Sequence, residues 1–499
     1  MEWIVNIVFI IIKAEIIFLY SKIIKKMTQS DLCLTIYKNQ KNFFNSKKSN
    51  DLSYRIKSLK KLKKVIVKFE DKIIDALNLD LGKSYAESYM SEISIIYNEI
   101  NYVLSNIKKW SRRKKISSSL LNFFSSDYIQ PSPYGVTLNI SPWNYPFQLS
   151  ISPIIGAISA GNTVVLKPSE HSPNTTSILE IIVNKAFSRG HVDVVKGGPE
   201  TGKNLLELDW DYIFFTGSTE IGKIVASQAA KTLTPVTLEL GGNNPCVVDR
   251  DVSINIASKR IAWGKFLNCG QTCIAPNFVA VHENVKRKFV KSLTKEIIKT
   301  HGSDPRNSDF YSSIINPNHV ERLSKLIKGY DLIHGGKYDK KLNYFEPTVL
   351  QVQSIKDKIL KYEIFGPILP IISYKNDEEL NNILVEYKNP LAFYIFSKRL
   401  SYAKKIINSY SFGGGAINDI LGQIVNKNLP FGGIGNSGIG KYHGYESFKT
   451  FSHFKSYIIK SNIFDIPFKY RMNHKGFVFR ILKKLLKHIS VWWRRNLTK

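Results

Sequence analysis

Short runs of β-branched and aromatic residues alternate with helical runs through the middle of the chain. The strand-like runs are GVTLNIS from Gly135, NTVVLKPS from Asn162, HVDVVKG from His191, YIFFTGS from Tyr212, VTLELGG from Val236 and NPCVVD from Asn244. Helical patterns lie around Thr176–Ser188, after Thr219 and from Ile254 to Asn268. Strands that alternate with helices favour βαβ units and a parallel sheet. We therefore expect an α/β fold whose ligands bind at the carboxyl ends of the strands.

Residues 51–115 precede this pattern and are expected to be helical. Apolar residues recur every three or four positions from Leu59 to Phe69 and again from Ile93 to Trp110. A chain of 499 residues that is 43% hydrophobic is long enough for more than one domain and for a large core. No long linker rich in Pro, Ser or Gly separates these regions, and no internal repeat is visible.

The four cysteines of the chain are too few for a disulfide framework and indicate a reducing compartment. Two of them, Cys269 and Cys273, lie in the stretch NCGQTCIAPN. Cys273 follows a helical run and precedes the strand-like run FVAVH, so free backbone N–H groups can lower its pKa and make it a nucleophile. The spacing is neither that of a CxxC redox pair nor that of a zinc site. Spacing alone leaves a structural pair of cysteines equally open.

Two strand-to-helix corners have the residues expected of a nucleotide site. In FFTGSTEIGK, glycines at the start of a helix offer free N–H groups to a phosphate, although the spacing from Gly217 to Gly222 differs from GxGxxG. In VVLKPSE, Lys167 and Glu170 stand where they can bind ribose hydroxyls. An ordinary corner and a surface ion pair are the alternatives.

Two further residues carry possible chemistry. Glu239 in LELGG is a lone acid among apolar neighbours, which raises its pKa and suits a general base, whereas a structural Glu in a salt bridge is the alternative. Asn144 in SPWNYPF lies between Trp143 and Tyr145, where a rigidly held amide can donate to an oxyanion. Alone, Asn144 can equally brace a turn.

Taken in order, these motifs closely resemble those of the aldehyde dehydrogenase superfamily. The matching stretches are SPWNYPF, GNTVVLKPSE, FFTGSTEIGK, TLELGGNNP, NCGQTCIAP, EIFGPILP and LPFGGIGNSGIGKYHGYESFKTFSH. The resemblance covers residues 31–458 without a large gap. The short N-terminal helical region, NYPF and the final motif resemble the class 3, fatty aldehyde branch. This likeness implies a Rossmann-like NAD-binding domain, an α/β catalytic domain and a small β element for bridging and oligomerisation.

The resemblance assigns catalytic roles residue by residue. Cys273 matches the nucleophile, and Cys269 matches a neighbouring cysteine that is not the nucleophile. Glu239 matches the general base, and Glu363 can share that role in this branch. Asn144 matches the oxyanion donor, together with the backbone N–H of Cys273.

The resemblance also implies a nicotinamide cofactor and a substrate site without a metal. The residues that match cofactor contacts are Lys167, Glu170, Gly217, Ser218, Gly222, Glu363 and Phe365. Those that match the substrate end are Tyr145 and His443. The carboxylate of Glu170 should repel a 2′-phosphate, so we expect NAD with some tolerance of NADP.

The domain bounds follow from the same likeness. They are an apolar N-terminal extension over residues 1–30, an NAD-binding domain over 31–240 with a bridging segment at 116–134, a catalytic domain over 241–418, a return to the NAD-binding and bridging region over 419–458, and a basic amphipathic tail over 459–499.

The net charge of +31 is concentrated in flanking segments. Residues 38–72 contain twelve basic and three acidic residues, residues 108–115 contain six basic residues, and residues 455–499 contain twelve basic residues and one acidic residue. Such segments can face anionic lipid or nucleic acid. A solvated basic surface, produced by a composition rich in Lys, is the alternative.

Both ends of the chain contain many apolar residues. Residues 3–24 are interrupted by Lys13 and Glu15, which disfavours a spanning helix. An interfacial helix, or an upstream extension with Met27 as the working start, fits them better. Residues 476–499 mix apolar, aromatic and basic residues at helical spacing, as in an interfacial amphipathic helix. A helix packed on the protein itself or on a dimer partner is the alternative.

The resemblance implies NAD(P)-dependent oxidation of aldehydes to carboxylates through a thiohemiacetal and a thioester of Cys273. We expect medium- to long-chain aliphatic aldehydes, with aromatic or other aldehydes open. A cytoplasmic homodimer, peripherally attached to an anionic membrane surface by its tail and without a specific nucleic-acid partner, is expected. The alternatives are a non-catalytic protein that binds nucleic acid and a membrane scaffold. The presence of Cys273, Glu239 and Asn144 argues against a protein that has lost catalysis.

Overall fold

The computed structural model describes residues 28–118, 122, 125–463, 476, 477, 479–481, 483 and 484. The expected N-terminal extension, except for its last three residues, and most of the expected basic tail therefore lie outside the described residues. The chain divides into two compact units, one within Met1–Arg112 and Pro131–His453 and one within Arg113–Gln130 and Phe454–Lys499.

A six-stranded sheet has the order β17-β7-β6-β3-β4-β5, and all its strands are parallel except β17. Its strands are β3 (Val136–Ile140), β4 (Thr163–Lys167), β5 (Val192–Val194), β6 (Tyr212–Thr216), β7 (Val236–Glu239) and β17 (Gly438–Ile439). The chain proceeds outward from β3 through β4 to β5 and then returns to the other side of β3 for β6 and β7. The strand order therefore reverses between β3 and β6, and β4 lies next to β3 at the same sheet edge, where open α/β sheets bind ligands.

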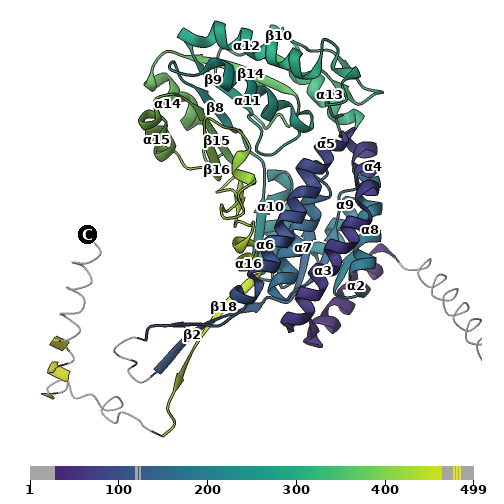
Figure 1. Ribbon diagram of the computed structural model, residues 1–499, viewed down its shortest axis with the longest axis vertical. Helices are drawn as coiled ribbons and strands as arrows, with labels where there is room; N and C mark the ends of the chain where they lie inside the picture. Colours follow the sequence, from purple (N-terminus) through teal and green to yellow (C-terminus); the bar gives the residue numbers. More distant parts are fainter. Residues whose placement is uncertain are drawn as a thin grey trace, which may run out of the picture. The chain divides into compact units, whose positions relative to one another are not determined.

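Helices cover both faces of this sheet. Side chains of α2, α9 and α10 share one hydrophobic core with Leu138, Phe215 and Leu238 of the sheet. Side chains alternate between the faces of a strand, so Asn139 and Glu239 face the opposite side, where α7 accepts a hydrogen bond from Asn139. Figure 1 shows α3, α6 and α7 side by side on that face. The helices of this region are α2 (Gln29–Asn45), α3 (Leu52–Lys68), α4 (Glu70–Leu81), α5 (Tyr85–Ser88), α6 (Ser94–Trp110), α7 (Gln148–Ala160), α8 (Pro173–Ala186), α9 (Pro199–Leu206), α10 (Thr219–Ala230) and α16 (Tyr445–Thr450).

A seven-stranded sheet has the order β10-β13-β14-β9-β8-β15-β16 and is parallel except for β10. Its strands are β8 (Pro245–Val248), β9 (Phe278–His282), β10 (Leu332–His334), β13 (Thr348–Gln351), β14 (Ile368–Tyr374), β15 (Ala392–Phe396) and β16 (Gly414–Ile417). Helix α12 packs on β9 and β14 and against α11, whereas α14 packs on β14 and α15 on β15. These helices and the remaining ones are α11 (Ile254–Phe266), α12 (Glu283–His301), α13 (Pro317–Leu326), α14 (Asp377–Glu386) and α15 (Leu400–Ser409), and a two-stranded pair joins β11 (Tyr338–Asp339) to β12 (Tyr344–Phe345).

A third sheet has the order β1-β2-β18. Its strands are β1 (Lys114–Ile116), β2 (Ser125–Pro133) and β18 (Ser452–Lys460), and β1 pairs with β2 in an antiparallel register. This sheet falls on the segment expected to form a bridging element, but the exact domain bounds stay predictions.

The α/β class expected from the strand and helix alternation is confirmed. One expected boundary is wrong: the helix expected to reach Asn268 ends at Phe266. Asn268 and Cys269 take left-handed backbone conformations, with φ of 51° and 53°, which an α-helix does not tolerate. Within the part of the chain that is described, no helix combines the length and the apolar character needed to cross a membrane.

Candidate active site

The loop that carries Cys273 begins with a run of unusual backbone geometry. Asn268, Cys269 and Gly270 are consecutive residues with positive φ, a conformation that costs free energy for residues other than Gly. A Cβ atom at Gly270 would lie 2.3 Å from the carbonyl oxygen of Gly366, so this position requires glycine. The turn therefore packs directly on the EIFGP segment and sets the direction of the loop that follows.

Asn244 fixes the far side of the same loop. Its side-chain Nδ2 donates to the carbonyl oxygens of Cys273, at 2.7 Å, and Ala275, at 3.0 Å. The backbone N–H of Asn277 donates to the carbonyl oxygen of Asn244 at 2.8 Å. Asn244 stands just before β8, so the catalytic loop is tied to the start of a central strand of the seven-stranded sheet.

The NYPF segment meets this loop from the six-stranded sheet. The Nδ2 of the buried Asn144 donates to the carbonyl oxygen of Gln271 at 3.0 Å. The hydroxyl of Tyr145 forms a hydrogen bond of 2.6 Å with the Thr272 hydroxyl. Both side chains therefore contact the two residues that precede Cys273, as the sequence motif required.

Glu239 ends β7 and is only 3% exposed. Neither carboxylate oxygen has a hydrogen-bond partner. Burial raises the pKa of this carboxyl group well above its ordinary value, because a charged carboxylate loses its hydration in an apolar environment. The expectation of a lone acid with a raised pKa is confirmed, and the alternative of a structural salt bridge is wrong.

The pKa expected for Cys273 is wrong in direction. Burial raises the pKa of its thiol, and the charges of Glu363 and Glu239 raise it further, whereas backbone N–H groups of the loop lower it. Desolvation and two nearby carboxylates outweigh the loop dipoles. Cys273 is therefore a protonated thiol at neutral pH in this structure, and both carboxylates lie near it.

Glu363 and Phe365 also belong to this site. They lie on the turn after the short helix that ends at Leu360. A Cβ atom at Gly241 would overlap the Glu363 carboxylate, so this side chain rests on the LELGG turn. Burial raises the pKa of Glu363 to about 8, against the lowering effect of Gly242 N–H and Lys265. The Phe365 ring meets the Trp143 ring edge-to-face at 5.3 Å.

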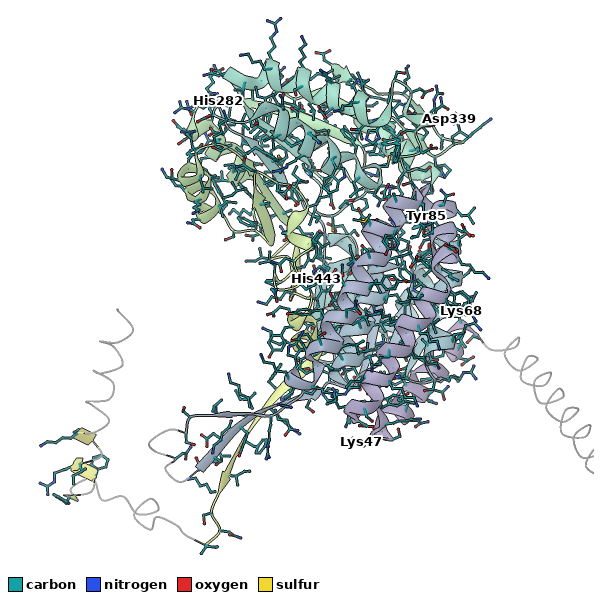
Figure 2. All side chains as sticks on the ribbon, in the orientation of Figure 1. Lys47, Lys68, Tyr85, His282, Asp339 and His443 are labelled. Atoms are coloured by element: carbon teal, nitrogen blue, oxygen red, sulfur yellow. The ribbon has the colours of Figure 1, made fainter. Side chains whose placement is uncertain are left out.

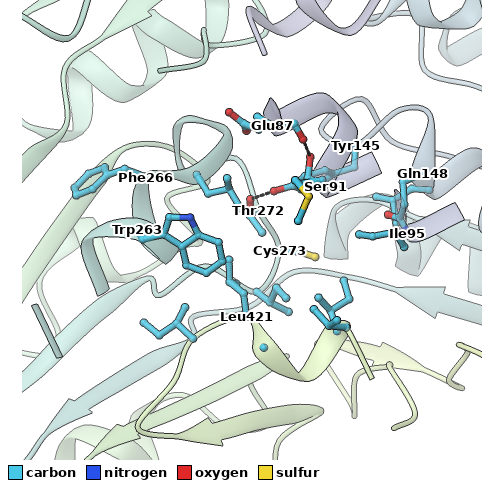
Figure 3. Close-up of a pocket in the computed structure, with 18 of the residues that line it drawn as sticks. Glu87, Ser91, Ile95, Tyr145, Gln148, Trp263, Phe266, Thr272, Cys273 and Leu421 are labelled. Atoms are coloured by element: carbon cyan, nitrogen blue, oxygen red, sulfur yellow. Dashed lines mark hydrogen bonds between the residues drawn. The ribbon is translucent and has the colours of Figure 1, made fainter. Parts of the chain in front are cut away.

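A cavity of about 870 Å³ lies at this site and is lined by Cys273, Glu239 and Tyr145 among other residues. Most of its wall is apolar, from side chains such as Leu149, Trp263, Phe266, Phe310, Leu421 and Phe431. Figure 3 shows Trp263, Phe266 and Leu421 on one side of Cys273 and Ile95 and Gln148 on the other. The exposed side chains of Met90, Trp263, Phe310 and Val425 belong to the same wall, so the cavity opens to solvent through an apolar mouth.

His443, which is labelled in Figure 2, is not one of the residues that line the cavity. It lies one layer behind them, with its ring stacked on Phe431 at 5.4 Å and against Tyr442 at 4.5 Å. Both ring nitrogens are buried without a partner, and burial lowers the pKa of His443 to about 3. Its expected place at the substrate end is corrected to a place that supports the substrate wall.

Five of the residues expected to hold the cofactor, all but Glu363 and Phe365, lie at the carboxyl ends of β4 and β6. Lys167 Nζ forms an ion pair of 2.9 Å with Glu170, so the surface ion pair considered as an alternative does exist, although Lys167 itself is buried. Ser218 caps α10 by accepting a hydrogen bond from Ile221 N–H. At Gly217 a Cβ would collide with the Phe215 ring, and Gly222 lies buried on the first turns of α10.

This edge suits a dinucleotide. The N-terminus of a twelve-residue helix, α10, presents free N–H groups and a positive dipole to a phosphate. Lys167 and Glu170 supply a donor and an acceptor for ribose hydroxyls beside it. Among the described residues, no group of three or more His, Cys, Asp or Glu side chains is arranged to hold a metal ion.

Sequence reasoning missed several residues of this site. Asn244 and Thr272 stand inside quoted motifs, but no periodicity or spacing marks their contacts. The buried Lys265 donates to the carbonyl oxygen of Pro276 at 3.0 Å, and burial lowers its pKa to about 7. A lysine in a helical run normally indicates a solvated face, so no signal in the sequence identified it.

Comparisons with known proteins decide the family. The Aldehyde dehydrogenase family matches residues 23–457. The chain belongs to the aldehyde dehydrogenase family. It therefore oxidises aldehydes and uses NAD or NADP, and the expected reaction class is confirmed.

Similar aldehyde dehydrogenases come from bacteria and mammals. The 4,4'-diaponeurosporen-aldehyde dehydrogenase of Staphylococcus aureus is 43% identical, over 85% of this chain and 93% of its own length. Aldehyde dehydrogenase family 3 member A2 of Pongo abelii is 41% identical, over 84% and 86%. The dimeric NADP-preferring aldehyde dehydrogenase of Rattus norvegicus is 40% identical, over 85% and 94%. The likeness to the class 3 branch is thereby confirmed.

A solved structure gives the same aldehyde dehydrogenase fold. The substrate-bound state of Staphylococcus aureus AldH superimposes with a TM-score of 0.88 and 41% identity, covering 91% of this chain and 99% of that one. The two sheets and the cavity described above are therefore those of an aldehyde dehydrogenase.

Replacing Glu239 with Gln should stabilise the protein, and increasingly so as the pH rises above 4.5. Folding raises the pKa of Glu239 above its ordinary value of 4.5, so above that pH the unfolded state loses a proton that the folded state retains. The wild type thus loses stability with rising pH at this position, and Glu239→Gln does not. We expect a gain of about 1 kcal/mol or more at pH 8, measured by chemical unfolding across the pH range.

Glu200 provides a matched control, because this exposed residue in the first turn of α9 should give a Gln variant that parallels the wild type. Wild-type and Glu239→Gln curves that remain parallel from pH 4.5 to 8 would contradict the raised pKa.

Proposed function

We propose that this enzyme oxidises medium- to long-chain aliphatic aldehydes to carboxylates, with Cys273 as the nucleophile. The observation that carries the proposal is the apolar cavity of about 870 Å³ that contains both Cys273 and Glu239 in its wall. Ligand sites bury most of the ligand surface in apolar walls and orient it with a few polar groups. A hydrocarbon chain along these walls leaves its aldehyde group at the polar end.

The first chemical step is attack of the Cys273 sulfur on the aldehyde carbonyl carbon. The raised pKa of the thiol means that the sulfur must lose its proton during the attack, and Glu239 is the cavity carboxylate assigned to accept it. The carbonyl oxygen becomes an oxyanion, which Asn144 Nδ2 and the Cys273 N–H stabilise by donating hydrogen bonds. The product is a thiohemiacetal on Cys273.

NAD(P)⁺, which the residues at the carboxyl ends of β4 and β6 would hold, would supply the hydride acceptor for oxidation of the thiohemiacetal. The acyl group then remains on Cys273 as a thioester. After Glu239 has passed the thiol proton to solvent, it takes a proton from a water molecule, which attacks the thioester carbon. The C–S bond breaks, Glu239 returns its proton to the departing sulfur, and the product acid loses a proton to solvent as it is released as a carboxylate. The raised pKa makes the Glu239 carboxylate a stronger base, which suits both proton transfers.

The residues assigned to the cofactor follow the geometry of the switch point. Lys167 and Glu170 hold the adenosine ribose, the turn of Gly217, Ser218 and Gly222 faces the phosphates, and Glu363 with Phe365 contacts the nicotinamide half. Glu170 favours NAD, because its carboxylate repels a 2′-phosphate. NADP remains a tolerated cofactor, as the name of the rat relative indicates for that protein.

The assembly and location of the enzyme extend the proposal. The six-stranded sheet belongs to an NAD-binding domain over residues 31–240, to which residues 419–458 return with β17. The seven-stranded sheet belongs to a catalytic domain over 241–418. A homodimer formed with the third sheet is supported by the dimeric relative. The basic and apolar residues from 459 onward suit peripheral attachment of a cytoplasmic enzyme to an anionic membrane surface.

Cys273→Ser should abolish nearly all aldehyde oxidation, by roughly a thousandfold or more in kcat. A serine hydroxyl is a weaker nucleophile and its ester is a poorer intermediate than a thioester. The measurement is NADH formation with a saturating aliphatic aldehyde. Cys269→Ser is the matched control, since Cys269 is buried against Tyr311 and should retain most activity. A Cys273→Ser enzyme that keeps a tenth of the wild-type rate would disprove the assignment.

The value of kcat/KM should rise with aldehyde chain length, by up to about fourfold for each added CH₂, because each buried methylene contributes about 0.8 kcal/mol. The series runs from about two to sixteen carbons, with NADH formation as the readout. Benzaldehyde tests the aromatic alternative. A flat or falling series would overturn the aliphatic substrate class but leave the reaction class intact.

Glu170→Gln should shift the cofactor preference toward NADP by roughly tenfold in the ratio of kcat/KM values. The change removes the repelling carboxylate and frees the Lys167 ammonium from its ion pair. Glu446→Gln is the matched control, because Glu446 on α16 pairs with Lys449 at 2.6 Å and is none of the residues assigned to the cofactor. An unchanged ratio in Glu170→Gln would remove Glu170 from the cofactor site.

A further inference from the structure

A buried ion pair lies behind the NYPF segment and outside the cavity wall. Lys83 Nζ lies 2.5 Å from Glu92 Oε1, and neither side chain is exposed. Lys83 stands between α4 and α5, and Glu92 lies in the π-helical turn Tyr89–Ile93. Neither residue lines the cavity. Burying two charges is costly even when they are paired, so the other contacts of this pair indicate what it does.

Lys83 holds the backbone of the assigned oxyanion donor. Its Nζ donates to the carbonyl oxygen of Asn144 at 3.0 Å, and the side chain of Asn268 donates to the same oxygen at 2.8 Å. The ammonium also lies 4.1 Å from the centre of the Tyr145 ring, a distance typical of a cation–π contact. One charged group thus fixes both residues that reach the catalytic loop.

Glu92 holds the following residues of the segment. Its Oε2 accepts hydrogen bonds from the backbone N–H groups of Phe147, at 2.9 Å, and Gln148, at 3.0 Å. These groups begin α7, which has no side-chain cap of its own. A carboxylate at a helix N-terminus satisfies free N–H groups and the helix dipole. Glu92 therefore caps α7 from another helix.

The segment is thus held from two sides. Behind it, Lys83 and Glu92 bind its backbone at Asn144, Phe147 and Gln148. In front of it, the Asn144 amide and the Tyr145 hydroxyl bind Gln271 and Thr272 of the catalytic loop. A shift of the backbone would therefore move the Asn144 amide relative to Cys273, and such shifts sharply reduce catalysis.

We propose that Lys83 and Glu92 are positioning residues for aldehyde oxidation, which hold Asn144 and Tyr145 against the Cys273 loop. The inference rests on the proposed role of Asn144 as oxyanion donor. It assigns no contact between the pair and substrate or cofactor. The pair acts on the rate of the chemical steps, through the placement of the Asn144 amide, and leaves cofactor binding unaffected.

The first test uses Lys83→Met and Glu92→Gln in the full-length enzyme. Each should lower kcat at least about tenfold, with the KM for aldehyde and the Kd for NAD⁺, measured by fluorescence quenching, changed less than about threefold. The combined variant Lys83→Met/Glu92→Gln removes both charges and should recover thermal stability relative to Lys83→Met. It should not recover kcat, because the Asn144 carbonyl oxygen still lacks the hydrogen bond from Lys83.

The second test is a double-mutant cycle with Asn144→Ala. If Lys83 acts through Asn144, Lys83→Met should lower kcat by less than about threefold in the Asn144→Ala background. Multiplicative losses would overturn the proposal. An Asn144→Ala enzyme with wild-type kcat would overturn the proposed role of Asn144, and this inference with it. A large loss in Asn144→Ala together with multiplicative losses would overturn the inference alone.

Asp249→Asn controls for a general loss of stability. Asp249 is a buried carboxylate beyond β8 that pairs with Arg399 at 2.7 Å and accepts from Ser397 at 2.6 Å. The Asp249→Asn substitution should lower the melting temperature while leaving kcat within about twofold of the wild type. The proposal is overturned if folded Lys83→Met and Glu92→Gln keep kcat within twofold of the wild type. It is also overturned if their loss of kcat is no larger than that of Asp249→Asn when the melting temperatures fall equally. Glu92→Gln, which keeps the size of the side chain, decides the matter if Lys83→Met does not fold.

Discussion

The connection between the two large sheets is the constraint on which the site depends. The chain leaves the six-stranded sheet at Glu239 and enters the seven-stranded sheet at Pro245. So short a link gives the two strands little freedom to move apart, and its residues take part in packing and hydrogen bonding at the site. Gly241 makes room for the Glu363 carboxylate, and Asn244 binds the carbonyl oxygens of Cys273 and Ala275. Glu239 and Cys273, the proposed base and nucleophile, are therefore brought together by one tight crossover.

The site contains buried polar groups that make fewer hydrogen bonds than buried polar groups usually do. Glu239 has no hydrogen-bond partner, and the pKa of both Glu239 and Cys273 is raised by burial. Such groups cost folding free energy, which a large core elsewhere offsets. The same desolvation makes the Glu239 carboxylate a stronger base, which suits an enzyme proposed to deprotonate a thiol and then a water molecule. These buried groups therefore reduce the free energy of unfolding at the site where the chemistry is proposed to take place.

The backbone geometry of the turn before Cys273 also belongs to the design of the site. Three consecutive residues with positive φ precede the catalytic loop, and this strained turn is held between Gly366 on one side and Asn144 on the other. The NYPF segment is held in turn by buried charges at Lys83 and Glu92. The nucleophile thus stands on a loop that is braced by both sheets.

Much of the fold could be predicted from the sequence, because local patterns decide it. Runs such as TVVLK and YIFFT form strands wherever both faces are covered, and they became β4 and β6. The lone acid in LELGG correctly indicated a raised pKa. Expectations based on one residue and its neighbours in sequence failed where distant groups dominate. The loop of Cys273 can by itself lower the pKa of the thiol, yet burial and two carboxylates from other segments raise it.

The sequence by itself determined the α/β class, the order of the motifs and the residue types that can act as nucleophile, base and oxyanion donor. Only the tertiary structure decided which of them share a cavity, that His443 lies behind the substrate wall, and that Lys83 and Glu92 lie fully buried against Asn144. The physical reason is range. Periodicity and turn chemistry act over a few residues, whereas desolvation and hydrogen bonding depend on neighbours that the fold brings from far along the chain.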